Sequence, residues 1–353
     1  MSTRVRSFCK INLGLAVGPP RADGFHALVT VYQTLQLHDF VIVTATRAAD
    51  TTIQITSNHR GVPRSEAGSA ERNTAWRMVH KTLERLKIMA NVHIHIEKTL
   101  PIQGGMGAGS ANAAAATLGL ERELGVALDG PTRLEVAAEI GSDVPLFLLG
   151  GTVLGLNRGE EVYPLPDSPP LHCVVALPDI GVSTALAFQQ LDAAELTSGA
   201  AVDKLKQLSR ALASVWSTTG VESGPSGIAF MDRTGMIPGD LPSGLASEMR
   251  DVSGDLAENP LLALVRTGIE NDFEEVVFSQ HPSLRSTKRD LMGSSRESAL
   301  YAALSGSGSA LFGLYKSQTD ALAAQHRVQQ NGTRAILTET LPRREYWHTM
   351  FAE

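Results

Sequence analysis

A glycine-rich run, PIQGGMGAGSANAAAAT, occupies residues 101–117 and has the composition of a phosphate-binding loop. Glycine adopts positive φ without strain and lets backbone N–H groups approach an anion closely. The alanine-rich stretch that follows favours a helix, whose first N–H groups and dipole attract negative charge. The loop residues concerned are Gly104, Gly105, Gly107, Gly109 and Ser110. The run predicts a phosphate cradle at a helix start, and a tight turn that only packs helix on sheet is the alternative.

Two other nucleotide-binding motifs do not fit this loop. No Lys-Ser or Lys-Thr pair closes it, and no strand ending in an acid follows at the dinucleotide-binding distance, since Glu121 and Glu123 fall inside the expected helix. A Rossmann oxidoreductase is therefore the weakest interpretation.

The segment KINLGLAV places Lys10 and Asn12 on one face of an expected strand and Ile11 and Leu13 on the other. Two polar groups that project together could contact a substrate. A surface lysine on a solvated strand face is the alternative.

A carboxylate, Asp143, lies in the segment EIGSDVPLFLLGG at residues 139–151, after an expected helix end at Gly141. An Asp at such a position can cap the next helical turn. If it points into a cleft, it could instead take a proton from a hydroxyl group.

An aromatic ring and an imidazole follow a turn signal at Asp23-Gly24. Phe25 and His26 could stack on and hydrogen-bond to a planar ring. Alternatively, Phe25 belongs to the core and His26 caps the turn.

A second glycine loop, LSGSGSALFGLY, occupies residues 304–315 and precedes an apolar strand. One such loop could be a simple turn. Two of them, together with a lysine and a carboxylate, indicate one site assembled from two domains.

Alternating and helical patterns indicate the elements that position these groups. Residues 91–100 alternate as a half-buried strand, and residues 111–124 read as a helix that stops before Gly125. Residues 4–17 read as a strand, and residues 28–44 read as two more.

A helix is expected at residues 71–86, with Asn73 near its start, another at 132–140, and a strand at 151–156. Up to about residue 170 this order is compatible with one layered α/β domain. The pattern then restarts as a second domain. Its expected elements are strands at 172–177 and 309–315 and helices near 185–191, 202–216 and 260–278. Residues 218–254 are rich in Gly, Ser and Pro and read as an irregular excursion with poor order.

Composition excludes several classes of protein. The 353 residues carry 31 basic and 37 acidic side chains, a net charge of -6 without a basic block, which disfavours nucleic-acid binding. Cys9 and Cys173 stand in apolar surroundings and are expected to be buried free thiols. No apolar run reaches membrane-spanning length, and no signal or transit segment is visible, so a cytoplasmic location is expected.

The joint order of these segments resembles the GHMP kinase superfamily, which includes galactose, homoserine, mevalonate and phosphomevalonate kinases. Within it the chain is most similar to the family that phosphorylates 4-diphosphocytidyl-2-C-methyl-D-erythritol in the non-mevalonate isoprenoid pathway. The matching blocks span most of the chain. They are KINLGL, RADGFH, PIQGGMGAGSANAAAA, GSDVPLFL, GVST and SGSGSALF.

The resemblance implies an α+β (mixed α/β) fold with an ATP-binding N-terminal domain over residues 1–165 and a ferredoxin-like C-terminal domain over 166–353. The active site is then in the cleft between them, and an insertion near 198–259 exceeds the family's second domain. The implied partner is a small molecule that carries a cytidine diphosphate, and the chain is expected to be a monomer or weak homodimer.

The resemblance also implies ATP-dependent phosphorylation of the substrate's 2-hydroxyl group, with Mg2+ on the ATP phosphates. Asp143 is then the base and Lys10 stabilises the ionised carboxylate and the developing alkoxide. The substrate-side residues are Asn12, Phe25, His26 and Thr184. The nucleotide-side residues are Asn73, Lys98, Pro101, Gly104, Gly105, Met106, Gly107, Ala108, Gly109 and Ser110, and Ser110 is the candidate metal contact.

Three residues depart from the family pattern. Phe25 stands where tyrosine is common, and Ala108 and Ala111 stand where Gly and Ser are usual. Ala111 removes a hydroxyl group near the phosphates, which leaves Ser110 as the remaining contact.

Two other functions stay open from the sequence. One is a related kinase for an alcohol such as mevalonate or homoserine, which the RADGFH block disfavours. The other is a non-catalytic sensor of a nucleotide or metabolite, which the presence of Lys10, Asp143 and both glycine loops disfavours.

Overall fold

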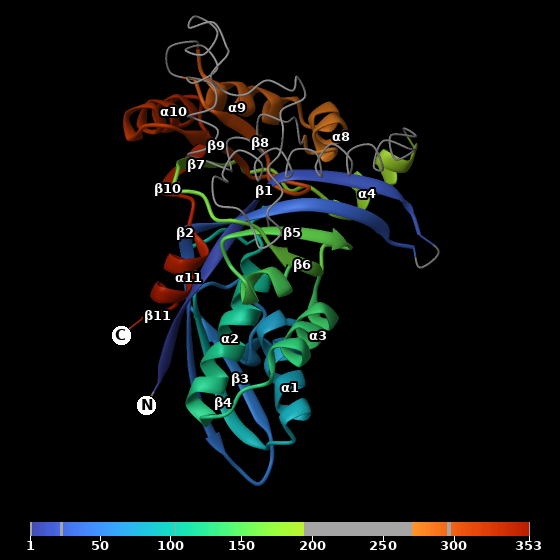
Figure 1. The fold of residues 1–353 in the computed structure, drawn as a ribbon, viewed down its shortest axis with the longest axis vertical. Coiled ribbons are helices and arrows are strands. Elements are labelled where there is room, and N and C mark those ends of the chain that lie inside the picture. Colours follow the sequence, from blue (N-terminus) through green and yellow to red (C-terminus); the bar gives the residue numbers. More distant parts are fainter. Residues whose placement is uncertain (1, 22–23, 103, 194–269, 295–297, 353) are drawn as a thin grey trace, which may run out of the picture.

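The computed structural model describes residues 2–21, 24–102, 104–193, 270–294 and 298–352 (Figure 1). The helix expected at 202–216, the insertion near 198–259 and the first part of the helix expected at 260–278 lie outside the described residues.

The first layer is a sheet with the strand order β11-β1-β2-β4-β3, in which β5 also pairs with β2, and β6 with β5. The pair β3–β4 is parallel, and the other pairs of this sheet are antiparallel. The strands are β1 (Thr3–Pro20), β2 (His26–Arg47), β3 (Thr52–Ser57), β4 (Ala90–Glu97), β5 (Thr152–Asn157), β6 (Glu161–Pro164) and β11 (Phe351–Ala352).

One long strand, β2, replaces the two strands expected within residues 28–44, so that prediction was wrong. No glycine or proline interrupts this stretch, and the break appears instead as a register shift in the pairing with β1. Lys10 pairs with Thr34, whereas Phe8 pairs with His38. Because β2 is continuous, its first part pairs with β5 and its last part with β4.

Helices α1 and α2 cover one face of this sheet, with α3 beside them (Figure 1). The side chain of Asn73 caps α1 by accepting a hydrogen bond from the amide of Ala75, and Gly125 ends α2 in the left-handed conformation. A Cβ on Gly119 of α2 would lie 2.7 Å from Val43, so glycine permits close packing on β2. The helices are η1 (Ser65–Ala67), η2 (Ala70–Arg72), α1 (Thr74–Leu86), α2 (Ala108–Leu124), α3 (Gly130–Ile140) and η3 (Pro145–Leu148).

The second layer is an antiparallel sheet with the order β10-β7-β9-β8. Numbered within this sheet the order is 4-1-3-2, with helices between β7 and β8 and between β9 and β10, which is the split βαβ pattern of a ferredoxin-like domain. The strands are β7 (His172–Leu177), β8 (Tyr301–Leu304), β9 (Leu311–Tyr315) and β10 (Arg334–Glu339). The helices of this layer are α4 (Thr184–Ala193), α8 (Phe273–Gln280), α9 (Pro282–Met292) and α10 (Gln318–Gln330), whereas α11 (Arg343–Thr349) packs with the first layer.

A hydrophobic core joins the two sheets. Ile11 and Leu13 on β1 pack in one cluster with Cys173 and Val175 on β7 and with Phe312 on β9. This arrangement uses the apolar face of β1 and leaves its polar face, with Lys10 and Asn12, directed the other way. The other face of the second sheet packs against α8, α9 and α10.

The chain ends on the first sheet rather than the second. After β10, α11 leads to β11, which pairs with β1, and the two termini lie on the same side of the molecule (Figure 1). The mixed α/β fold and its ferredoxin-like sheet are confirmed, and the boundary near residue 165 stays a prediction. No helix within the described ranges is both long and apolar enough to span a bilayer.

Candidate active site

The polar face of β1 meets the end of α3 at a pair of opposite charges. The ammonium nitrogen of Lys10 lies 3.3 Å from Oδ2 of Asp143 and 2.6 Å from Oδ1 of Asn12. The side chain of Lys10 is 3% exposed and that of Asp143 is 32% exposed, so the carboxylate is open to a ligand while the amine is held beneath it. The interpretation of Lys10 as a surface lysine is therefore wrong.

The pairing of β1 with β2 is irregular on both sides of Lys10 and Asn12. Register shifts fall between Phe8 and Lys10 and between Asn12 and Gly14, and irregular strand pairing commonly occurs next to active sites. Asn12 donates to Oγ1 of Thr30 at 2.8 Å, which fixes its amide and presents its oxygen to Lys10.

Asp143 is directed at β1 and β2 rather than at the helix that follows it. The side chain of Asp143 accepts a hydrogen bond from the hydroxyl group of Tyr32 at 3.0 Å through Oδ1, and the N-cap of η3 is Val144. Burial raises the pKa of the Tyr32 phenol, and the Asp143 and Glu160 carboxylates raise it further. The phenol therefore remains a proton donor at neutral pH.

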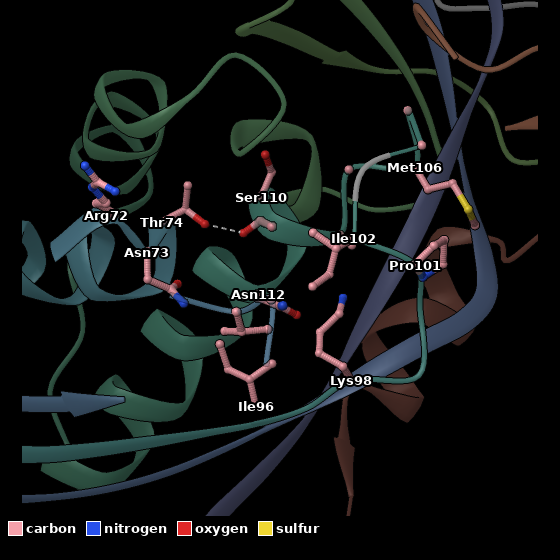
Figure 2. A pocket seen from close by; sticks show the side chains of 17 residues that line it. Arg72, Asn73, Thr74, Ile96, Lys98, Pro101, Ile102, Met106, Ser110 and Asn112 are labelled. Atoms are coloured by element: carbon pink, nitrogen blue, oxygen red, sulfur yellow. Dashed lines mark hydrogen bonds between the residues drawn. The ribbon is translucent and has the colours of Figure 1, made fainter. Parts of the chain in front are cut away.

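A cavity of about 510 Å³ lies along the first glycine loop and the start of α2. That volume falls within the range of small-molecule sites, roughly 300–1,000 Å³. Figure 2 shows Ile96 and Lys98, at the end of β4, and Ser110 and Asn112, on α2, around it, with Arg72, Asn73 and Thr74 across from the loop. The remaining lining residues are Gly61, Val62, Pro101, Ile102, Gly104, Gly105, Met106, Gly107, Ala108 and Gly109.

The loop has the backbone that an anion cradle needs. Gly104, Gly105 and Gly107 have φ values of 153°, 75° and 68°, which other residues rarely adopt. A Cβ on Gly107 would lie 2.9 Å from the ring of Phe147 and 3.2 Å from Cε of Lys10. Gly107 therefore lines the cavity on one side and contacts Lys10 on the other. A phosphate bound in the cavity and a hydroxyl group bound at the Lys10–Asp143 pair would lie next to each other at this glycine.

The two glycine loops contact each other directly. The hydroxyl group of Ser305 donates to the carbonyl oxygen of Gly105 at 3.1 Å and accepts from the amide of Asn12 at 3.3 Å, and the amide of Ala310 donates to the carbonyl oxygen of Gly104. A Cβ on Gly105 would lie 2.0 Å from the carbonyl oxygen of Ser305. The two glycine loops therefore lie together, as one site assembled from both domains requires, and the shared site itself stays a prediction.

Asn73 and Lys98, which are expected on the nucleotide side, both have partners within the protein. Asn73 caps α1 and donates to the carbonyl oxygen of Pro63 at 2.9 Å, and the ammonium of Lys98 lies 2.5 Å from Oδ2 of the buried Asp39. Both residues line the cavity. Their contact with a nucleotide stays a prediction.

The Phe25–His26 pair separates at the start of β2. Phe25 is exposed and lies under the guanidinium group of Arg158, so it is not a core residue. The imidazole of His26 is buried and stacks on Phe188 of α4, with 4.9 Å between ring centroids. Nδ1 of His26 lies 2.9 Å from the carbonyl oxygen of Gly18 and must carry the proton there, because a carbonyl only accepts.

Thr184 begins α4 and lies beside the second glycine loop. Its hydroxyl group is 2.7 Å from that of Ser307. The residue expected on the substrate side is thereby tied to the loop that contacts Gly105.

The site offers few protein ligands for a metal ion. Among the residues that the structure describes, no group of three His, Cys, Asp or Glu side chains is arranged to hold one. Ser110 lies in the first turn of α2 and lines the cavity, and Ala108 and Ala111 lie on either side of it along the chain.

Sequence reasoning missed three groups at this site: Tyr32, Phe188 and Asn271. Tyr32 could have been found from its even spacing with Thr30 on the strand that pairs with Lys10 and Asn12. Phe188 and Asn271 gave no local signal. Asn271 donates to the carbonyl oxygens of Leu304 and Gly306 and so holds the second glycine loop.

Two family models match the chain. The model described as the GHMP kinases N terminal domain covers residues 73–151, and the one described as GHMP kinases C terminal covers residues 255–334.

Relatives of known name match over most of the chain. A protein of Solibacter usitatus named 4-diphosphocytidyl-2-C-methyl-D-erythritol kinase is 32% identical over 352 residues, which covers 99% of this chain and 93% of that protein. One of the same name from a Nocardioides species is 41% identical over 192 residues, which covers 53% of this chain and 62% of that protein.

Solved structures share the fold. A 4-(cytidine 5'-diphospho)-2C-methyl-D-erythritol kinase matches with a TM-score of 0.62 and 25% identity, covering 96% of this chain and 99% of that one. A homoserine kinase from Cytophaga hutchinsonii matches with a TM-score of 0.61 and 18% identity, covering 97% of this chain and 95% of that one. At that lower identity the likeness concerns the fold alone.

Proposed function

The chain belongs to the 4-diphosphocytidyl-2-C-methyl-D-erythritol kinase family of the GHMP kinases, and we propose that it transfers the terminal phosphoryl group of ATP to the 2-hydroxyl group of that cytidyl alcohol. The observation that carries the proposal is the 3.3 Å approach of Lys10 to Asp143 beside a glycine-lined cavity. Phosphoryl transfer depends mainly on positioning and on stabilising charge, and these groups supply both.

ATP fits the cavity through its phosphates. The backbone N–H groups of the glycine loop and of the first turn of α2 favour negative charge. The positive φ of Gly104, Gly105 and Gly107 disfavours other residues, and a Cβ at Gly105 or Gly107 would also clash with its neighbours. A Mg2+ ion would be held mainly by the ATP phosphates, with the hydroxyl group of Ser110 as the candidate protein ligand, because Mg2+ commonly binds through substrate phosphates and water. When bound, the ion neutralises charge on the transferred group.

Asp143 and Lys10 act on the acceptor hydroxyl group. The carboxylate of Asp143 takes the proton as the hydroxyl oxygen forms a bond to the γ-phosphorus, and the bond from that phosphorus to the β–γ bridging oxygen breaks to release ADP. The ammonium of Lys10 stabilises the negative charge that develops on the attacking oxygen. Asn12 holds this ammonium in place.

The long substrate fits along β2. His26 and Tyr32 are six residues apart on one strand, a distance of about 20 Å at roughly 3.3 Å per residue. A pyrimidine ring near His26, Phe25 and Phe188 would therefore leave room for a diphosphate before the alcohol reaches Asp143. Mevalonate and homoserine have no group to fill that length.

Phosphorus NMR tests the proposal. Protein, ATP, Mg2+ and the cytidyl alcohol should yield a new phosphomonoester signal, and methylerythritol without the cytidine diphosphate should yield none. Phosphorylation of mevalonate or homoserine, without reaction of the cytidyl alcohol, would overturn the assignment.

A further inference from the structure

Tyr32 contacts both charged groups of the candidate active site. It pairs with Asn12 across the β1–β2 ladder, which places its side chain on the polar face that carries Lys10. Its hydroxyl group donates to Oδ1 of Asp143 at 3.0 Å, and its ring centroid lies 5.4 Å from the ammonium nitrogen of Lys10. One aromatic side chain thus touches the acid through its edge and the amine through its face.

A glycine-lined slot holds the ring of Tyr32. A Cβ on Gly155 of β5 would lie 2.5 Å from the ring carbon Cε2, and a Cβ on Gly159 would lie 2.4 Å from the phenol oxygen. The β5–β6 hairpin can close on the ring because both positions are glycine. With the ring 2% exposed, the phenol has little freedom to turn away from Asp143.

The two oxygens of Asp143 therefore have different partners. Oδ1 accepts from Tyr32, and Oδ2 faces Lys10. Without the phenol, the plane of the carboxylate could turn about the last bond of the Asp143 side chain, and neither oxygen would be held in one direction. A fixed carboxylate keeps one oxygen toward the amine and the acceptor hydroxyl group, which is the orientation that proton transfer needs.

We propose that Tyr32 is a positioning residue that locks the carboxylate of Asp143 in its reactive orientation. The inference rests on the proposed function, because it takes Asp143 as the base. Tyr32 acts through Asp143 and does not itself exchange a proton.

The first test is the variant Tyr32→Phe, which removes one oxygen and keeps the ring in its slot. The expected result is a fall in kcat of about tenfold, the size expected for losing one hydrogen bond to a charged group. The KM for ATP should stay within about twofold, since Tyr32 does not line the nucleotide cavity. A kcat within about twofold of the wild type would overturn the inference.

Tyr315→Phe is the matched control. Tyr315 is fully buried in the second sheet, and its hydroxyl group donates to the carbonyl oxygen of Leu291 at 2.7 Å. The variant loses one buried hydrogen bond but no contact with Asp143, so its kcat should be that of the wild type. An equal fall in kcat in both variants would mean a general structural effect and would overturn the inference.

A second measurement does not depend on the substrate. In a double-mutant cycle by urea unfolding, Tyr32→Phe should lower the folding equilibrium constant about fivefold more in the wild-type background than in the Asp143→Ala background. Absence of this coupling would overturn the proposed bond between Tyr32 and Asp143. Coupling without turnover of the cytidyl alcohol by the wild type would instead overturn the proposed function, on which the positioning role rests, and leave only the bond between Tyr32 and Asp143 standing.

Discussion

The ammonium nitrogen of Lys10 lies 3.3 Å from Oδ2 of Asp143, although one residue is on β1 and the other follows α3. Neither residue lines the cavity beside the glycine loop, but the position of Gly107 brings that loop against the Lys10 side chain. The proposed reacting groups and the proposed nucleotide cavity are therefore adjacent yet built from different residues, and substitutions should separate chemistry from nucleotide binding.

Asp143→Ala should reduce phosphoryl transfer by a factor of about 10²–10⁴, the contribution typical of a positioned general base. Nucleotide binding should persist because the cavity residues are unchanged. A coupled ADP-release assay measures the first quantity, and calorimetric titration with a non-hydrolysable ATP analogue measures the second. Turnover at the wild-type rate would remove Asp143 from its role.

Gly105→Ala should disturb the contact between the two glycine loops. The new Cβ would lie 2.0 Å from the carbonyl oxygen of Ser305, and the φ of 75° is unfavourable for alanine. Together, overpacking and backbone strain should lower the free energy of unfolding by about 3 kcal/mol and raise the KM for ATP. Urea unfolding and steady-state kinetics measure the two effects.

Gly125→Ala is the control for that substitution. Gly125 has a similar φ of 65°, but an added Cβ meets nothing within 4 Å. Only the backbone cost of about 1–2 kcal/mol should appear, with an unchanged KM for ATP. Equal effects of the two variants would contradict the loop-contact explanation.

Both cysteine thiols should be inert in the folded protein. Cys9 and Cys173 are fully buried, and burial is the largest cause that raises the pKa of each thiol. Because the thiolate is the reactive form, Ellman's reagent should not react under native conditions and should titrate both thiols in denaturant. Rapid reaction of either thiol in the native protein would show that the core between the two sheets opens readily.

Much of the fold follows from local patterns. The alternation of apolar and polar residues predicts β4, and the structure has that strand. The alanine-rich stretch predicts α2, and Gly125 predicts where this helix ends. The division of β2 into two strands failed because a register shift, rather than a turn, accommodates the irregularity near Thr34. Strand pairing depends on distant partners, which a local pattern does not contain.

In the candidate site too, local patterns predict some residues, and others depend on partners that are distant in the sequence. Lys10, Asn12 and Asp143 could be predicted because each stands in a recognisable block, and the structure brings all three together. The spacing of Tyr32 with Thr30 could place it on the polar face of its strand, but its bond to Asp143 could not be predicted, since Asp143 lies far along the chain. Asp39 is a similar case, because its pairing with Lys98 depends on the β2–β4 register.

Lys98→Met separates a structural from a nucleotide-binding role for Lys98. The side chains of Lys98 and Asp39 are 4% and 0% exposed, and Asp39 also accepts from the amides of Thr99 and Leu100. Removing the ammonium leaves a buried carboxylate without its counter-charge, which should lower the free energy of unfolding by about 3–5 kcal/mol. Adding Asp39→Asn should recover part of this loss, because the double variant has no buried charge.

The exposed pair of Lys81 and Glu139 supplies the control, with side chains 44% and 40% exposed. Lys81→Met should cost no more than about 1 kcal/mol, since solvent screens that pair. Urea unfolding of these three variants and the wild type, with the KM for ATP measured on each, distinguishes the two roles. If Lys98 is chiefly a nucleotide contact, Lys98→Met will raise the KM for ATP, and its unfolding curve will coincide with that of Lys81→Met. The addition of Asp39→Asn will then restore no stability.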